Sequence, residues 1–261
     1  MVLENANKTN TITEETQNNQ RMDQPVRLLF GVDSKIQSND LLQNNIDMFE
    51  WVTKNKIYPI FWGRNIIGEN SLTKDEIKFL HDKGCKIAAI CNTSDSKKSE
   101  EQGKIFAKKV ILAALELGIS LGTAIFLEIA ENEDITKNYL RGFAKAMLVE
   151  GYIPGFKANT DARFEFDCEF SRGMKAEKDV FGKCLIWAVA PSLAEYDGIT
   201  TTHLIHPNTW NPFAPSGISR NDIAIWQYGK DCHPIYDDYN KEVVFNVSVL
   251  KDSKVILNNL F

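Results

Sequence analysis

The feature that most constrains the fold is an alternation, from residue 26 onward, of short β-branched or aromatic runs with longer amphipathic stretches. Such alternation is typical of βα units that build a parallel sheet. It predicts eight strands in one series, at residues 26–32, 57–62, 85–91, 121–130, 152–158, 184–190, 201–205 and 222–228. Residues 243–249 also alternate, and we expect them to form an extra strand or hairpin beyond these eight.

The stretches between the strands carry helix signals. In residues 39–54, apolar side chains recur at helical spacing. Thr73 and Glu76 fit a capping box at the start of a second helix, which Gly84 would close. Further helices are predicted at residues 99–117, 136–150 and 162–173. Residues 207–217, rich in Pro, Asn and Gly, are predicted to form a loop.

This order of elements predicts an α/β fold, a (β/α)8 TIM-type barrel that is irregular in its last third. The length of 261 residues suits one such barrel. A doubly wound open sheet is the alternative, but it calls for a glycine-rich turn after the first strand, and Gly31-Val32-Asp33-Ser34 is not one. We expect a disordered polar tail at residues 1–24 and one barrel domain at residues 25–261.

The amino-acid composition limits the classes of partner that we expect this protein to bind. A net charge of −5 gives no general attraction to nucleic acid or anionic membranes, and no run is apolar enough for a membrane span. The first residues lack the cationic start and apolar core of a secretory signal. We therefore expect a protein that is cytoplasmic, or released without a usual signal to act at the cell wall. The five Cys and four His show no ligand spacing, so no metal and no cofactor is predicted.

Polar and aromatic residues gather where the predicted strands end. The carboxyl ends of barrel strands and the loops after them form the active site in such folds. Amides, carboxylates and aromatic rings suit a carbohydrate, which offers hydroxyls and apolar faces. The residues predicted to line this mouth are Asp33, Trp62, Arg64, Asn92, Glu128, Asn159, Asp161, Trp187, Trp226, Gln227 and Tyr228.

Several of these positions also have a purely structural interpretation. Trp187 and Trp226 are large enough to be core residues, and Arg64 could form a structural salt bridge. Glu128 stands in an apolar run, where an unpaired carboxylate is costly. It is therefore either functional or paired with Arg64 or a similar cation.

Segments spread from Gly31 to Tyr228 resemble the glycoside-hydrolase-like family of bacterial domains called domain of unknown function 1906. That family is similar to the lysozyme-like muramidases of glycoside hydrolase family 25. The matching segments are Gly31-Val32-Asp33-Ser34, Phe61-Trp62-Gly63-Arg64, Leu72-Thr73 with Glu76-Ile77, Gly84-Cys85-Lys86-Ile87, Gly122-Thr123-Ala124-Ile125-Phe126, Gly151-Tyr152 with Gly155, and Trp226-Gln227-Tyr228.

The resemblance implies an Asp on the first strand and an Asp-x-Glu pair at the end of a middle strand. Asp33 matches the first position. In the middle strand Glu128 can supply one acid, but its partner position two residues on is Ala130. Glu131, or Glu133 with Asp134, could replace the lost acid, although acids before a helix more often serve its N-terminal dipole.

These residues lead to a first hypothesis, a glycoside hydrolase acting on cell-wall glycan, or peptidoglycan. Glu128 would be the general acid and Asp33 the second carboxylate, the minimum for such chemistry. The alternative is a module that binds a glycan or wall fragment on the same barrel without hydrolysing it, as Ala130 suggests. A phosphodiesterase is disfavoured because neither a metal-binding His cluster nor a cationic phosphate cradle is evident.

Overall fold

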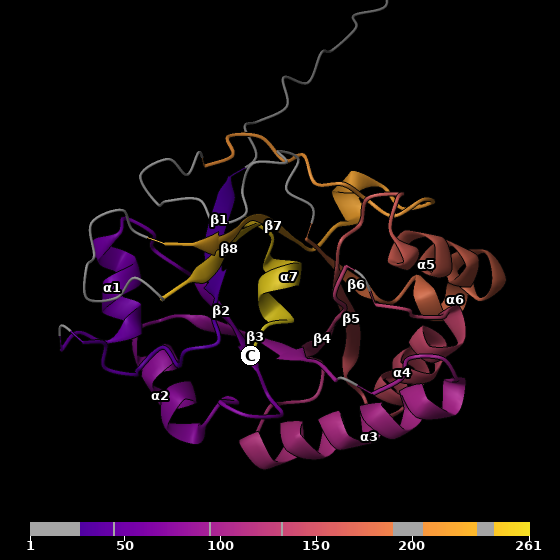
Figure 1. Ribbon diagram of the computed structural model, residues 1–261, viewed down its shortest axis with the longest axis horizontal. Helices are drawn as coiled ribbons and strands as arrows, with labels where there is room; N and C mark the ends of the chain where they lie inside the picture. The colour runs from indigo at the N-terminus through magenta and orange to yellow at the C-terminus, as the bar shows by residue number, and fades with distance from the viewer. Residues whose placement is uncertain (1–26, 44, 94, 132, 190–205, 234–242) are drawn as a thin grey trace, which may run out of the picture.

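The computed structural model describes residues 27–261, except 44, 94, 132, 190–205 and 234–242. The described part is an α/β structure around a closed barrel of eight strands in sequence order (Figure 1). The predicted TIM-type fold class is therefore confirmed. The strands are β1 (Leu28–Asp33), β2 (Phe61–Asn65), β3 (Lys86–Cys91), β4 (Ala124–Glu128), β5 (Ile153–Ala158), β6 (Leu185–Ala188), β7 (Ile225–Cys232) and β8 (Phe245–Lys251).

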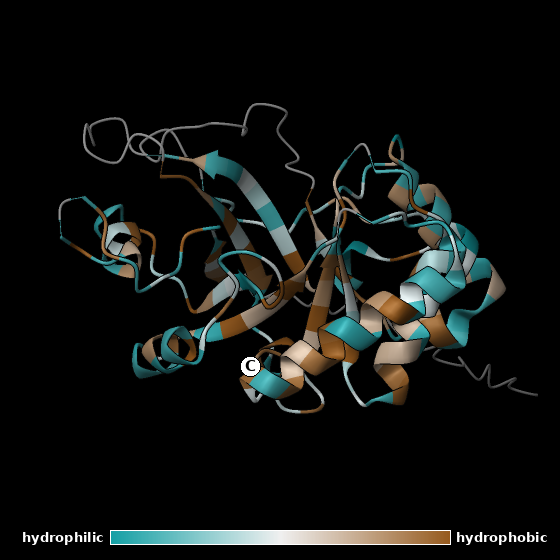
Figure 2. Ribbon diagram, turned by 60° about the horizontal axis from the view of Figure 1, so that its bottom comes forward, coloured by the Kyte–Doolittle hydropathy of each residue, from teal (hydrophilic) through white to brown (hydrophobic). Residues whose placement is uncertain are grey.

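The helices are α1 (Met48–Lys54), α2 (Lys74–Asp82), α3 (Glu100–Leu117), α4 (Lys137–Val149), α5 (Glu165–Ala176), α6 (Lys178–Phe181) and α7 (Lys254–Asn258), with a 3₁₀ turn at Arg220–Asp222. Helices α1 to α6 lie outside the barrel, whereas α7 crosses the middle of the view, and its Ile256 and Leu257 pack against the core inside the barrel (Figure 1). Hydrophilic and hydrophobic residues alternate along the helices, as expected of helices with one face on a sheet (Figure 2).

The barrel closes in a way that the sequence analysis got wrong. Residues 243–249 were expected to lie beyond the barrel, but β8 is its last strand and pairs antiparallel with both β7 and β1. Without β8, the edges of β1 and β7 would expose unpaired backbone groups. The pairs between consecutive strands from β1 to β7 are all parallel. The strand predicted at residues 201–205 and the tail predicted at residues 1–24 lie outside the described residues.

The first predicted helix is also shorter than expected. Only Met48–Lys54 of the predicted 39–54 is helical, and Asp47 caps it by accepting a hydrogen bond from the Glu50 amide. Asn45 has a φ of 58°, which a right-handed helix does not allow. The apolar side chain of Leu41, counted in the helical spacing, is 71% exposed.

Alternate residues of each strand serve two separate apolar cores. One core lies inside the barrel, where Phe61, Phe126 and Trp187 pack edge to face. The other lies between the barrel and the helices and includes Trp62 and Trp226. Because side chains alternate along a strand, this division decides which strand-end residues face the lumen.

Candidate functional site

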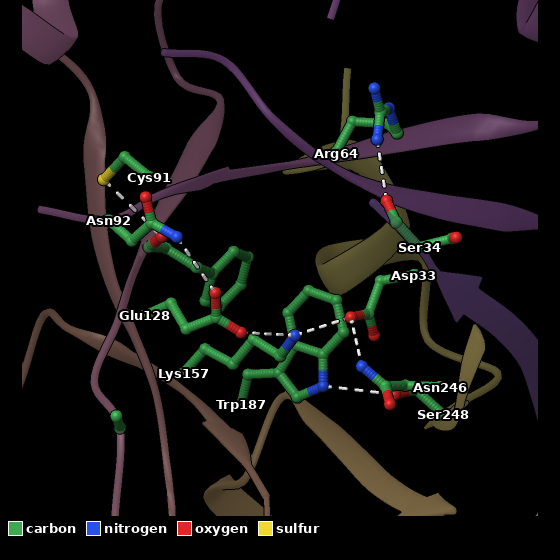
Figure 3. A network of polar contacts seen from close by, with 12 residues as sticks. Asp33, Ser34, Arg64, Cys91, Asn92, Glu128, Lys157, Trp187, Asn246 and Ser248 are labelled. Atoms are coloured by element: carbon green, nitrogen blue, oxygen red, sulfur yellow. Dashed lines mark hydrogen bonds and ion pairs between the residues drawn. The ribbon is translucent and has the colours of Figure 1, made fainter. Parts of the chain in front are cut away.

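Two carboxylates and a lysine meet at the barrel mouth, defined here as the carboxyl ends of β1 to β7. The Lys157 Nζ lies 2.7 Å from Asp33 Oδ2 and 2.9 Å from Glu128 Oε1 (Figure 3). Lys157 on β5 is the register partner of Glu128 on β4. Strands β1 and β5 lie on opposite sides of an eight-stranded barrel, so the Lys157 side chain spans the mouth to reach Asp33.

The Lys157 ammonium group packs on the face of an aromatic ring, that of Trp187. The Lys157 Nζ lies 4.9 Å from the centroid of the Trp187 ring, and the Trp187 indole donates a hydrogen bond to Ser248 Oγ at 3.2 Å (Figure 3). A desolvated cation over a tryptophan face is attracted by the ring quadrupole. The absence of a side chain at Gly63 makes space for Trp187 and Asp33, since a Cβ at that position would lie 2.9 Å from the Trp187 ring and 2.7 Å from Asp33 Cβ.

The ion pairs of Lys157 shift the pKa values of Glu128 and of Lys157 itself. The Lys157 ammonium holds the pKa of Glu128 below its usual range, against the opposing effect of burial. Burial alone would lower the pKa of Lys157, but Asp33 and Glu128 outweigh it and raise that pKa. Glu128 and Lys157 are therefore both charged at neutral pH. A general acid needs the opposite shift, a carboxyl pKa raised toward neutrality.

The network lines a cavity of about 250 Å³, which we call the mouth pocket. Asn246 on β8 donates a hydrogen bond from Nδ2 to Asp33 Oδ2 at 2.8 Å, and Asn92 Nδ2 lies 3.5 Å from Glu128 Oε2. The residues lining the mouth pocket are Asp33, Ser34, Lys35, Ile36, Gly63, Asn65, Ile90, Asn92, Glu128, Lys157, Asp231, Val244, Phe245 and Asn246.

Of the predicted site residues, Asp33, Glu128 and Asn92 line the mouth pocket, and Trp187 lies beneath its lysine. Sequence reasoning missed Lys157, although a lysine inside the apolar run Pro154 to Ala158 and one strand from Glu128 was a usable signal. It missed Asn246 because β8 was not assigned to the barrel.

Trp62 and Arg64 do not line the mouth pocket, because both belong to the outer face of β2. Trp62 is buried against the ring of Phe49. Arg64, 1% exposed, pairs with the fully buried Glu76 at 3.0 Å and donates hydrogen bonds to the Ser34 and Asn70 carbonyls. Its structural interpretation is therefore correct. Thr73 caps α2 as predicted, by accepting a hydrogen bond from the Glu76 amide, but the Glu76 side chain binds Arg64 and the Ser38 amide instead of completing a capping box.

Trp226 and Tyr228 also point outward and do not line the mouth pocket. Trp226 packs edge to face on Trp210 and belongs to the core between barrel and helices. The Tyr228 hydroxyl lies 2.6 Å from His206 Nδ1. Gln227, between them on β7, is buried and likewise does not line the mouth pocket.

The loop residues predicted for the site form local contacts outside the mouth pocket. Asn159 donates a hydrogen bond to Glu131 Oε1 at 2.8 Å, and Asp161 pairs with Arg163 at 2.9 Å. The other acids considered as replacements are also paired, Glu133 with Lys97 and Asp134 with Lys98. Ala130 itself is exposed and lies two residues after the end of β4.

Within the described residues, no group of three or more His, Cys, Asp or Glu side chains is placed to hold a metal ion. No helix in that part of the chain is long and apolar enough to cross a membrane.

Comparison with solved structures shows a shared fold. An uncharacterised B. stearothermophilus protein matches with a TM-score of 0.71 and 24% identity, over 89% of this chain and 100% of that one. The autolysin LytC from Streptococcus pneumoniae, solved with a synthetic peptidoglycan ligand, matches with a TM-score of 0.51 and 13% identity, over 85% and 46%. A Streptomyces coelicolor lysozyme matches with a TM-score of 0.50 and 9% identity, over 88% and 97%.

The sequence comparisons identify the family. No curated protein matches the chain significantly. The family model of the Rv2525c-like, glycoside hydrolase-like domain matches residues 61–241, which is more than half of the chain. The resemblance to a glycoside-hydrolase-like family is thereby confirmed, together with the likeness of its fold to lysozymes. The chain belongs to the Rv2525c-like glycoside hydrolase-like domain family.

Proposed function

We propose that this protein binds peptidoglycan, or a fragment of it, in the mouth pocket and does not hydrolyse it at neutral pH. This assignment implies action at the cell wall. The family and the barrel shared with lysozymes support a glycan as ligand. LytC, a relative in fold, was solved with a synthetic peptidoglycan ligand. The pocket offers carboxylates and amides to bond the hydroxyls of a sugar.

The main reason to expect no hydrolysis is that Lys157 lies between Asp33 and Glu128 and pairs with both. Glycosidase chemistry needs one protonated carboxyl to release the leaving oxygen and one ionised carboxylate. Lys157 binds Asp33 and Glu128 together, and its bond to Glu128 favours the ionised form of that carboxyl group. The second acid of the family pattern is absent at Ala130. Glu128, the carboxyl group that would have to act as the general acid, is therefore ionised at neutral pH and has no proton to donate.

Hydrolysis is the second candidate, with Glu128 as general acid and Asp33 as the second carboxylate. It is favoured by one observation, that these two acids line the same pocket. It requires the bound substrate to displace Lys157 from Glu128 so that the carboxyl can take up a proton. The two candidates differ in whether glycosidic bonds are cut.

Purified peptidoglycan sacculi test both candidates. We expect the wild type to sediment with sacculi and to release no more reducing ends than Glu128→Gln, because Glu128 is not a proton donor. Asn138→Ala, on an exposed position of α4, serves as the control for handling and stability. Release of reducing ends by the wild type, lost in Glu128→Gln, would establish the hydrolase instead.

Restoring the missing acid should change this outcome. Ala130→Glu adds a carboxylate two residues after Glu128, and neighbouring like charges raise the pKa of one member of a pair. Because Ala130 is exposed, the variant should fold with little loss of stability. We expect measurable release of reducing ends from sacculi, above the wild-type level. Binding without release in Ala130→Glu would show that the second acid is not what the protein lacks.

A further inference from the structure

Two residues that line the mouth pocket, Asp33 and Asn65, each carry a buried oxygen atom that has no hydrogen-bond donor among the described residues. Asp33 is 6% exposed, and while its Oδ2 accepts bonds from Lys157 and Asn246, its Oδ1 has no partner. The Oδ1 of Asn65, at the end of β2, is likewise buried and without a partner. A buried acceptor that makes no hydrogen bond is costly, so both atoms call for a ligand that brings donors.

The charges that line the pocket favour a cationic donor. Three carboxylates, those of Asp33, Glu128 and Asp231, stand against two ammonium groups, those of Lys35 and Lys157. Lys157 is already engaged by Asp33 and Glu128, and Lys35 is exposed. One more positive charge would balance the pocket. Charge-assisted hydrogen bonds to carboxylates are also stronger than neutral ones.

We infer that the mouth pocket takes the primary ammonium group of an amino sugar that carries no N-acetyl group. This specificity rests on the proposed function, since it takes the ligand to be a glycan. An ammonium offers three donors, enough for Asp33 Oδ1, Asn65 Oδ1 and the partly exposed Glu128 carboxylate.

An N-acetylated sugar fits these groups less well. Acetylation removes the positive charge and leaves one N–H donor, while the acetyl carbonyl adds an acceptor where acceptors are already in excess. It also adds bulk in a cavity of about 250 Å³, below the ~300–1,000 Å³ of common ligand pockets. A sugar acid would add a fourth carboxylate to the lining.

Isothermal titration of the wild type with four probes tests the inference. The probes are tetramers of glucosamine, of N-acetylglucosamine and of glucose, and a lysine derivative as an amine without a sugar. We expect the glucosamine tetramer to bind at least about tenfold more tightly than each of the others, the effect of one charge-assisted hydrogen bond. Equal affinities of the three tetramers would overturn the inference. Binding of the lysine derivative as tight as that of the glucosamine tetramer would overturn it too.

Two variants of residues that line the mouth pocket test whether glucosamine binds there. Asn65→Ala removes an acceptor that has no partner in the free protein, so glucosamine binding should weaken roughly three- to tenfold while the melting temperature holds. Asp231→Asn removes one charge and keeps a side chain suited to its φ of 49°, so the preference for glucosamine should shrink. Asn138→Ala should match the wild type. Unchanged glucosamine binding in both pocket variants would contradict the site.

Sacculi separate this inference from the proposed function. Binding to untreated sacculi and to sacculi whose free amines have been chemically acetylated is compared in parallel. Equal binding to both would overturn the amino-sugar inference and leave peptidoglycan binding intact. Absence of binding to either kind, with tight glucosamine tetramer binding, would overturn peptidoglycan as the ligand and leave the amine specificity intact.

Discussion

Lys157→Met should lower the free energy of unfolding at pH 7 by about 3–5 kcal/mol, the usual result of removing one partner from a buried ion pair. Lys157 is 2% exposed and is the cation shared by Asp33 and Glu128. Methionine keeps an unbranched side chain of similar length over Trp187, so the loss reports the charge more than the packing. Urea unfolding of both proteins measures the difference.

The same variant should respond to pH in the opposite direction from the wild type. The folded state of the wild type lowers the pKa of Glu128, so this contribution is present above the unfolded pKa, near 4.3, and is lost as the pH falls through the folded value. In Lys157→Met, the two carboxylates face each other without a cation, and one of them binds a proton more readily than in the unfolded chain. The stability gap between the two proteins should therefore narrow at acidic pH.

A surface lysine provides the matched control. Lys145 pairs with Glu177 on the outside of the protein, where both side chains are partly exposed. Lys145→Met should lose less than about 1 kcal/mol at pH 7. If Lys157→Met lost no more than this control, or if its deficit stayed constant between pH 7 and pH 4.5, the buried charge network would not be the source of its stability.

Much of the barrel was predictable because short apolar runs that alternate with amphipathic stretches mark the segments that are buried as strands. Strands β1 to β7 each overlap a predicted segment, and the helix predicted at residues 99–117 contains α3 (Glu100–Leu117). The segment at residues 243–249 alternates equally well. Periodicity shows that a segment is a strand but carries no information about its partner strands. Its antiparallel place between β7 and β1 is decided by edge closure, which depends on the whole barrel.

The site was predictable only in part, for a related reason. A strand end offers residues of both faces, and the sequence does not say which face is the lumen. Trp62 and Arg64 are two residues apart and share the outer face of β2, whereas Gly63 and Asn65 line the mouth pocket. Asp33 and Glu128 were found because a carboxylate that ends an apolar strand stands out. Lys157 lies one strand away from Glu128, and its reach across the lumen to Asp33 is a tertiary property.

A second large effect is expected at Arg64, the residue that changed from a predicted ligand contact to a structural one. Arg64→Met should cost about 3–5 kcal/mol and lower the melting temperature by roughly 10 °C. The substitution leaves the fully buried Glu76 without its cation and frees the carbonyls of Ser34 and Asn70. Lys78→Met, which breaks an exposed pair with Asp82 on α2, should leave the melting temperature unchanged.

A double-mutant cycle separates the interaction energy of the Arg64–Glu76 pair from the contribution that each residue makes through its other contacts. Glu76→Gln keeps an acceptor for the Ser38 amide, now at 2.7 Å, and removes the charge that faces Arg64. Once Arg64 has become methionine, the Glu76 charge is a burden, so Glu76→Gln should then raise stability instead of lowering it. The coupling energy should reach roughly 1–3 kcal/mol, within the range for residues in one buried network. Additive losses in the two single variants would show that Arg64 acts through the Ser34 and Asn70 carbonyls, which lie in the loops beside the mouth pocket, and not through Glu76.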